Sequence, residues 1–321
     1  MRLATLFLLT VLPILAREPR IPPIKTTTFP AGQFEVTARF LDKGALKYEA
    51  RLQEIAQKTL PLATELFGGL PRGLDGCEDP NVALDFDTTR GFHGEADPGW
   101  IEMGIEEGLF FGFNDMDNGL VHELFHLWNS EAIRYKHRRE QWFSEGCTDY
   151  YGIKLAIRAG LIGKSEGVTR MLAPLANYLS AHGLGKRSIR AMCESQQLKM
   201  QHYFLVYHGG YVVSLVLDYD IRKTTKNQKS LDDLMRWLYQ NFDRSKGQLY
   251  ELEDFITGLQ EITGKDYTDF FGRYVTGIET IPVGDFFQRM QVEEVSRRMG
   301  WKKLDPLQEE ILQDMFELNP K

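Results

Sequence analysis

The order of the predicted elements constrains the fold of this chain most strongly. From about residue 118 to the C-terminus, apolar residues recur at helical spacing. A further helix is predicted over residues 43–67, where the pattern ends at Gly68-Gly69. The segments that predict strands all precede residue 118, at 34–40, 82–86, 100–103 and 109–113. A small sheet followed by a mostly helical half predicts an α+β fold rather than alternating βαβ units.

The first residues of the chain predict an export signal. Residues 1–16 carry one positive charge, at Arg2, followed by an apolar run that ends at Ala16. This pattern is typical of a secretory signal peptide, and the run is too short to cross a membrane comfortably. We therefore expect a periplasmic, cell-surface or extracellular protein. An uncleaved anchor stays open as the alternative.

The rest of the chain predicts a single domain. Residues 17–33 hold four prolines and predict an extended lead-in. We expect residues 34–321 to form this one domain, with the sheet in about 34–117 and the helical part in about 118–321.

The composition of the chain limits the kinds of partner that it can bind. The 321 residues include 38 Lys and Arg against 45 Asp and Glu, which gives a net charge of −7. Nucleic acid is therefore an unsuitable main partner, because phosphate-binding surfaces carry a basic excess. No second long apolar stretch follows the leader, so we expect no stable membrane insertion of the mature chain. The three cysteines, Cys77, Cys147 and Cys193, allow at most one internal disulfide, and the oligomeric state stays open.

The segment HELFH predicts a metal site. His122 and His126 are four residues apart in a predicted helix, so their imidazoles lie on one face and can bind one zinc ion. Glu123 points to the side of that ion, where it can accept a proton from a metal-bound water.

Glu145 is the candidate third ligand. It lies nineteen residues beyond His126, in the segment WFSEGCTDYYG. A second helix after a loop of this length can bring its carboxylate to the histidine face. Asp149, one helical turn later, can accept the free ring N–H of His122, or it is a solvated helix carboxylate. Cys147, between them, predicts a small buried side chain rather than a nucleophile.

These motifs resemble a known group of enzymes. HELFH, eighteen residues and then Glu145 resemble the ligand pattern of the gluzincin metallopeptidases. HELFHLWN and WFSEGCTDYYGIKLAIRAGLI resemble more specifically the glycyl aminopeptidase family, number sixty-one among the metallopeptidases, over about residues 80–290. The resemblance implies a thermolysin-like gluzincin catalytic domain. It also implies one zinc ion on His122, His126 and Glu145, with Glu123 as general base.

The resemblance implies two further roles. Tyr207, in Tyr207-His208-Gly209-Gly210, is the counterpart of a tyrosine that donates to the oxyanion, with Tyr203 or Tyr211 as alternatives. Glu102 is the weakest candidate, as the carboxylate that holds the α-amine of a substrate. Its alternative is an ordinary strand carboxylate.

The sequence departs from that family in several places. About a hundred residues precede the HELFH segment, whereas the family usually has a larger β-rich domain there and often a PDZ domain afterwards. Cys147 stands where the family has an aromatic residue, Gly209 replaces a lysine, and the family's GGLEH-type segment is not obvious.

Together these patterns predict a secreted zinc-dependent metallopeptidase that acts on a peptide substrate. An aminopeptidase is favoured by the resemblance. A zinc endopeptidase, or a catalytically silent peptide-binding relative, stays open, and the side-chain preference is not predicted.

Overall fold

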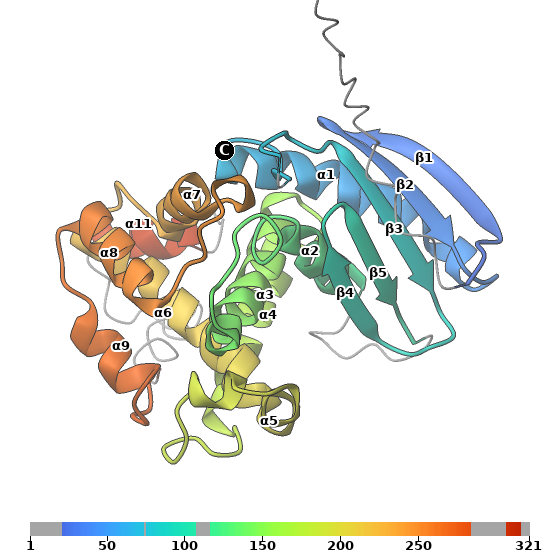
Figure 1. Ribbon diagram of the computed structural model, residues 1–321. Helices are drawn as coiled ribbons and strands as arrows, with labels where there is room; N and C mark the ends of the chain where they lie inside the picture. The colour runs from blue at the N-terminus through green and yellow to red at the C-terminus, as the bar shows by residue number, and fades with distance from the viewer. Residues whose placement is uncertain (1–20, 74, 107–115, 284–305, 316–321) are drawn as a thin grey trace, which may run out of the picture.

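The computed structural model describes residues 21–73, 75–106, 116–283 and 306–315. The predicted signal peptide and the strand predicted at 109–113 lie outside these residues. Figure 1 shows a twisted sheet on one side and a group of helices on the other.

A five-stranded mixed sheet forms the first part of the domain. Its spatial order is β1-β2-β3-β5-β4. The outer pairs β1/β2 and β4/β5 are antiparallel, whereas β2/β3 and β3/β5 are parallel. The strands are β1 Lys25–Ala31, β2 Phe34–Phe40, β3 Asn81–Asp87, β4 His93–Asp97 and β5 Trp100–Gly104. Strand β4 is therefore an edge of the sheet.

Three of the observed strands, β2, β3 and β5, match predicted ones. Strand β1 lies in the predicted lead-in, so the sheet begins before the predicted start at Phe34, because Lys25–Ala31 pairs along its whole length with β2. Strand β4 was not predicted. Its sequence, His93–Asp97, is short and has no apolar alternation. Among the described residues it pairs with a strand on one side only, so it lies at the edge of the sheet.

Helices make up the second part, as predicted. They surround α3 and α6, which cross near the centre of the helical half (Figure 1). The bounds of the α-helices, including α1 in the first part of the chain, are α1 Glu49–Phe67, α2 Met116–His126, α3 Gln141–Arg158, α4 Lys164–Leu179, α5 Gln196–Gln201, α6 Gly209–Thr224, α7 Leu231–Phe242, α8 Leu252–Thr263, α9 Thr268–Tyr274 and α11 Pro306–Met315. Helix α1 ends at Gly68, which has φ 79°, so the predicted glycine C-cap is confirmed.

The sheet packs against helices through an apolar face. One face presents buried apolar side chains such as Val36, Leu84 and Ile101, and α1 and α2 pack on it. This face also carries Gly94 of β4, which lies against α2. Burial of the apolar face fixes α2 beside the edge strand, and this arrangement positions the site described next. Among the described helices, none has the length and apolar character that a membrane crossing needs.

Candidate metal centre

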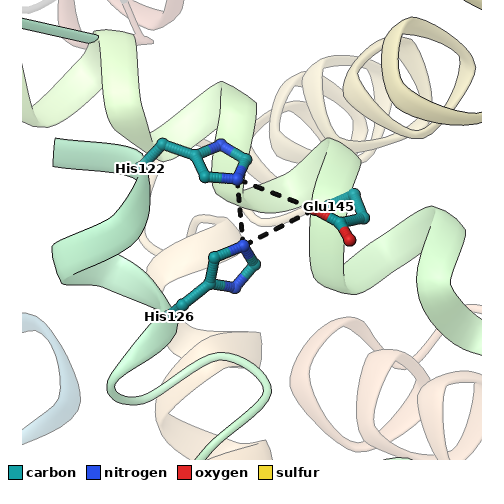
Figure 2. Close-up of side chains that lie close together, drawn as sticks. All are labelled: His122, His126 and Glu145. Carbon is teal, nitrogen blue, oxygen red and sulfur yellow. Dashed lines mark hydrogen bonds and ion pairs between the residues drawn. The ribbon is translucent and has the colours of Figure 1, made fainter. Parts of the chain in front are cut away.

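Two helices bring three potential metal ligands together. His122 and His126 lie one turn apart on α2, and Glu145 extends from α3 toward them (Figure 2). The Nε2 atoms of the two histidines are 2.9 Å apart. Oε2 of Glu145 is 3.6 Å from Nε2 of His122 and 3.5 Å from Nε2 of His126. The predicted convergence of these three side chains is thus present in the structure.

Hydrogen bonds on the far side of each ring fix the tautomers. Nδ1 of His122 lies 2.8 Å from Oδ1 of Asp149, the partner predicted for it. Nδ1 of His126 donates to the backbone oxygen of Asn129 at 2.8 Å. Because both Nδ1 atoms face acceptors, in the neutral form of each ring the lone pair of Nε2 is directed at the other ring and at a carboxylate oxygen.

This donor set fits a zinc ion. In the neutral rings, lone pairs that converge at such distances repel unless a proton or a metal ion lies between them. Ligand atoms of a tetrahedral zinc ion, about 2.0–2.1 Å from the metal, are roughly 3.3 Å apart, close to the three observed separations. In the part of the chain that is described, one other group of three residues could hold a metal, namely Asp87, His93 and Glu102. There the guanidinium of Arg90 already pairs with both carboxylates.

The charges of the site complement one another. Burial opposes the charged form of His122, but the hydrogen bonds to Asp149 and Glu145 outweigh burial and raise the pKa of the ring. Burial likewise opposes ionisation of Glu145. The two histidines and Lys199 outweigh it and hold the pKa of that carboxyl well below its usual range. Glu145 is therefore a carboxylate, the form that binds a metal.

Glu123 lies between the metal ligands and the edge strand. Its side chain is largely buried, with 9% of its surface exposed. It packs against Gly94 of β4, where a Cβ atom would meet its carboxyl group. Burial raises the pKa of Glu123, although the neighbouring histidines lower it. A carboxyl group with a raised pKa is suited to accept and return a proton near neutral pH.

A cavity of about 890 Å³ opens onto these residues. Strand β4 forms one wall, and helices α2, α3 and α5 form the others. Its carboxylates, besides Glu145 and Asp149, are Glu95, Glu123 and Glu131. A cavity of this size beside perturbed titratable groups is the usual form of a catalytic site.

Two tyrosines at a π-helical turn face the cavity, Tyr207 within the turn Phe204–His208 and Tyr203 directly before it. Tyr207 stacks on Tyr203 with ring centroids 4.2 Å apart, and both line the cavity. Burial raises the pKa of both phenols, so both keep an O–H group that can donate a hydrogen bond to an oxyanion. Tyr211 is fully buried and donates to the backbone oxygen of Met171 at 2.9 Å. The predicted alternatives are thereby reduced to Tyr207 and Tyr203.

Glu102 does not reach the cavity. It lies on the internal strand β5, with 3% of its surface exposed, and pairs with Arg90. The structure thus gives no support to the prediction that it holds a substrate amine, because strand β4, which forms this wall of the cavity, lies between β5 and the cavity. Its cross-strand neighbour on β4, Glu95, lines the cavity instead.

Besides Glu95, the charged cavity residues Glu131 and Lys199 were not singled out from the sequence. Glu131 follows α2 in a loop whose backbone bonds back to the helix, with its N–H donating to the oxygen of His126 at 3.2 Å. Lys199 of α5 donates to Oε1 of Glu145 at 2.8 Å. Neither has a motif around it, and only the fold brings them to the site.

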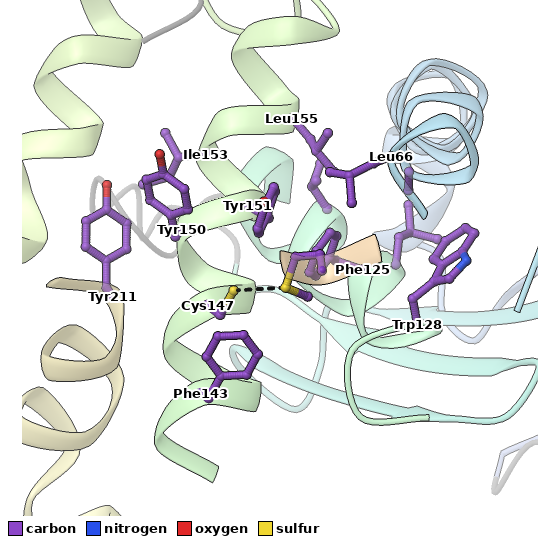
Figure 3. Packing of buried hydrophobic residues seen from close by; sticks show 14 of the residues in the cluster. Leu66, Phe125, Trp128, Phe143, Cys147, Tyr150, Tyr151, Ile153, Leu155 and Tyr211 are labelled. Carbon is purple, nitrogen blue, oxygen red and sulfur yellow. Dashed lines mark hydrogen bonds between the residues drawn. The ribbon is translucent and has the colours of Figure 1, made fainter. Parts of the chain in front are cut away.

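Aromatic packing behind the ligands holds α2 against α3 (Figure 3). Phe125 and Tyr151 stack with centroids 4.7 Å apart. Cys147 is fully buried beside them, and its Sγ lies 3.7 Å from the sulfur of Met235. The prediction of a small buried side chain at this position is confirmed.

Residues 117–213 match the model of the M61 glycyl aminopeptidase family. The matched segment contains both histidines, Glu123, Glu145 and Tyr207. This segment of the chain is therefore similar to the M61 glycyl aminopeptidase family. No curated protein gives a significant match to the sequence.

Solved structures of two other proteins share the fold of this chain. An aminopeptidase N family protein from Idiomarina loihiensis is 18% identical with a TM-score of 0.66, and the match covers 82% of this chain and 48% of that one. An M1 zinc metallopeptidase mutant from Deinococcus radiodurans is 16% identical with a TM-score of 0.57, over 81% of this chain and 54% of that one. The chain thus spans about half the length of the structures it matches. The mixed sheet followed by helices is the M1 catalytic-domain fold, as the gluzincin resemblance predicted.

Proposed function

We propose that this protein is a zinc metallopeptidase that hydrolyses peptide bonds, with aminopeptidase as its favoured activity. One observation carries the proposal. Nε2 of His122, Nε2 of His126 and Oε2 of Glu145 converge beside the buried carboxyl group of Glu123, on the wall of a cavity of about 890 Å³. These residues all lie within the M61 segment.

The side chains of the site divide the chemistry among them. His122, His126 and Glu145 would hold the zinc ion, which would supply a Lewis acid that lowers the pKa of a water. Glu123 would accept a proton from that water as its oxygen bonds to the peptide carbonyl carbon, and would return the proton to the amine released when the C–N bond breaks. The phenol O–H of Tyr207 donates to the oxyanion. Asp149 and the carbonyl of Asn129 hold the two imidazoles in their binding orientation.

Two carboxylates make an aminopeptidase the favoured activity. Glu95 on β4 and Glu131 after α2 lie on the cavity wall and are neither ligands nor the proposed base. A free α-ammonium group needs an anionic partner in such a cavity. We assign that contact to Glu95 and Glu131 in place of Glu102. A solved M1 relative is described as bound to a Tyr-Ser-Ala substrate, with 15% identity and a TM-score of 0.53.

We also propose that the protein is exported. This rests on the pattern of residues 1–16 alone. N-terminal sequencing of the protein recovered from culture supernatant and from cell fractions tests it, and an intact residue 1 in the cytoplasmic fraction would contradict it.

The function is tested with the wild type beside Glu123→Gln. We expect near-stoichiometric zinc in both proteins, because Glu123 is not among the three converging ligands. Aminoacyl anilides with a free N-terminus should be cleaved by the wild type only. The same compounds with blocked N-termini should be cleaved by neither protein. Cleavage of blocked peptides would indicate an endopeptidase. Zinc without turnover of any substrate would favour a silent relative, and folded protein without zinc would contradict the metal site.

A further inference from the structure

The two oxygens of Glu145 have different partners. Oε2 faces the histidines, at 3.6 Å and 3.5 Å from their Nε2 atoms. Oε1 accepts a hydrogen bond from Nζ of Lys199 at 2.8 Å. The carboxylate is thus held between the proposed metal position and an ammonium group.

Lys199 is a buried lysine with 4% of its surface exposed. In the described part of the chain, Glu145 is the one carboxylate within ion-pair distance of it. Its ammonium also lies 5.2 Å from the centroid of the Tyr207 ring. Burial of a lysine is unfavourable unless the charge is paired, so this ammonium is held to Glu145 by the lack of another strong partner.

The short helix that carries Lys199 is itself fixed. The hydroxyl of Ser195 accepts from the N–H of Leu198 at 3.2 Å, and the backbone oxygen of Ser195 accepts from the N–H of Lys199 at 3.0 Å. Helix α5 therefore begins at a capped turn, and Lys199 extends from its first turns toward α3. The capped turn thus fixes the backbone from which the ammonium of Lys199 reaches Glu145.

We propose that Lys199 is a positioning residue that restricts Glu145 to binding the metal through Oε2 alone. The inference rests on the zinc site proposed above. A catalytic zinc ion has three protein ligands and one position open for water. A carboxylate can supply one oxygen or two, and a second oxygen from Glu145 would compete with that water. The hydrogen bond from Lys199 keeps Oε1 occupied and directed away, so the fourth position stays open.

The test compares Lys199→Met with Lys199→Arg. The Met variant keeps the bulk of the side chain without its charge or N–H groups, whereas the Arg variant keeps both. Lys265→Met is the matched control, because Lys265 also pairs with a carboxylate, Asp220 at 2.6 Å, and lies 4.8 Å from the Tyr267 ring centroid outside the cavity. Zinc affinity is measured by competition with a chromogenic chelator. Coordination is followed by the visible absorption of the cobalt(II)-substituted proteins.

We expect Lys199→Met to bind zinc about tenfold more weakly, as for other residues that orient metal ligands. Its cobalt spectrum should lose intensity, because a second oxygen from Glu145 raises the coordination number from four to five. Lys199→Arg and Lys265→Met should match the wild type in both measurements.

An unchanged zinc affinity and an unchanged cobalt spectrum in Lys199→Met would overturn the positioning role. So would a rise in KM alone, which would make Lys199 a substrate contact. Failure of the wild type itself to bind zinc would instead refute the proposed function. If Lys199→Met does not fold, the spectrum and affinity of Lys199→Arg against wild type still decide, because a shift in its coordination number also contradicts the proposal.

Discussion

A Cβ atom on Gly94 would lie 2.5 Å from Cδ of Glu123 and 2.9 Å from its Cγ. The backbone of the edge strand β4 therefore lies directly against the proposed general base. Real Cβ atoms do not approach other atoms so closely, so any larger residue at position 94 must displace either β4 or the carboxyl group. The absence of a side chain at Gly94 sets where Glu123 can lie.

The first prediction follows from this contact. Gly94→Ala should lower kcat/KM by about 100-fold, because displacing a catalytic group by about 1 Å has effects of that size. Zinc content should be unchanged, since the three atoms nearest to the added Cβ all belong to Glu123, which is not one of the three converging ligands. Gly163→Ala is the control, because a Cβ there meets nothing within 4 Å. Full activity of Gly94→Ala would show that Glu123 does not need its observed position.

A second close approach joins the helix of Glu145 to the helix that follows Tyr207. A Cβ atom on Gly210 would lie 2.9 Å from the backbone carbon of Trp142, near the start of α3. We predict that Gly210→Ala lowers the free energy of unfolding by about 1–3 kcal/mol, because the added methyl meets backbone atoms that cannot move aside. Urea unfolding measures the change.

The neighbouring glycine provides the comparison for that measurement. A Cβ on Gly209 would lie 3.0 Å from Cδ1 of Ile189, the end of a flexible side chain. Gly209→Ala should therefore destabilise the protein less than Gly210→Ala does. The reverse order would show that the crossing of α3 and α6 tolerates separation.

The parts of the site that were predictable depend on local geometry. His122 and His126 share a face because any helix places residues four apart on one side. The contact of Asp149 with His122 follows from one further helical turn after Glu145, and the structure has it at 2.8 Å. Helical periodicity after residue 118 likewise needed no knowledge of long-range contacts.

The parts that were missed depend on packing between distant segments. Lys199 and Glu145 are 54 residues apart, and nothing in either segment shows that α5 folds onto α3. Glu102 was singled out although it does not line the cavity, because the sequence pattern identified a strand but not its place in the sheet. Strand β4, which lies between Glu102 and the cavity, has no apolar alternation that would have revealed it.

The cysteines give a third prediction. All three are free in the structure, so the single disulfide that the count allowed is absent. Cys77 is exposed, whereas burial raises the pKa of Cys147 and raises that of Cys193 to about 12. A thiolate is the reactive form, so we expect one thiol to react with a disulfide reagent in the native protein and three in denaturant. Cys77→Ser should show none in the native state. Fast reaction of a second native thiol would contradict the burial of Cys147 and Cys193.

The fourth prediction concerns the pH dependence of stability. Burial raises the pKa of Glu131 from 4.5 to about 7, although Arg134 and Arg244 lower it. Below pH 4.5 this carboxyl is protonated in both the folded and unfolded states and imposes no penalty. As the pH rises toward 7, the unfolded chain releases the proton first, so the folded state loses stability until the group is ionised in both states. The loss from this group amounts to about 3 kcal/mol.

Glu131→Gln removes this titration while keeping the shape of the protonated side chain. We therefore expect the variant to gain stability over the wild type between pH 4.5 and pH 8, by up to about 3 kcal/mol. Urea unfolding of both proteins in the presence of a chelator isolates Glu131, because the other titrating groups are common to the two. A difference between the proteins that does not change with pH would mean that the Glu131 carboxyl ionises as it does in water, and that the cavity wall around it is more open than the structure shows.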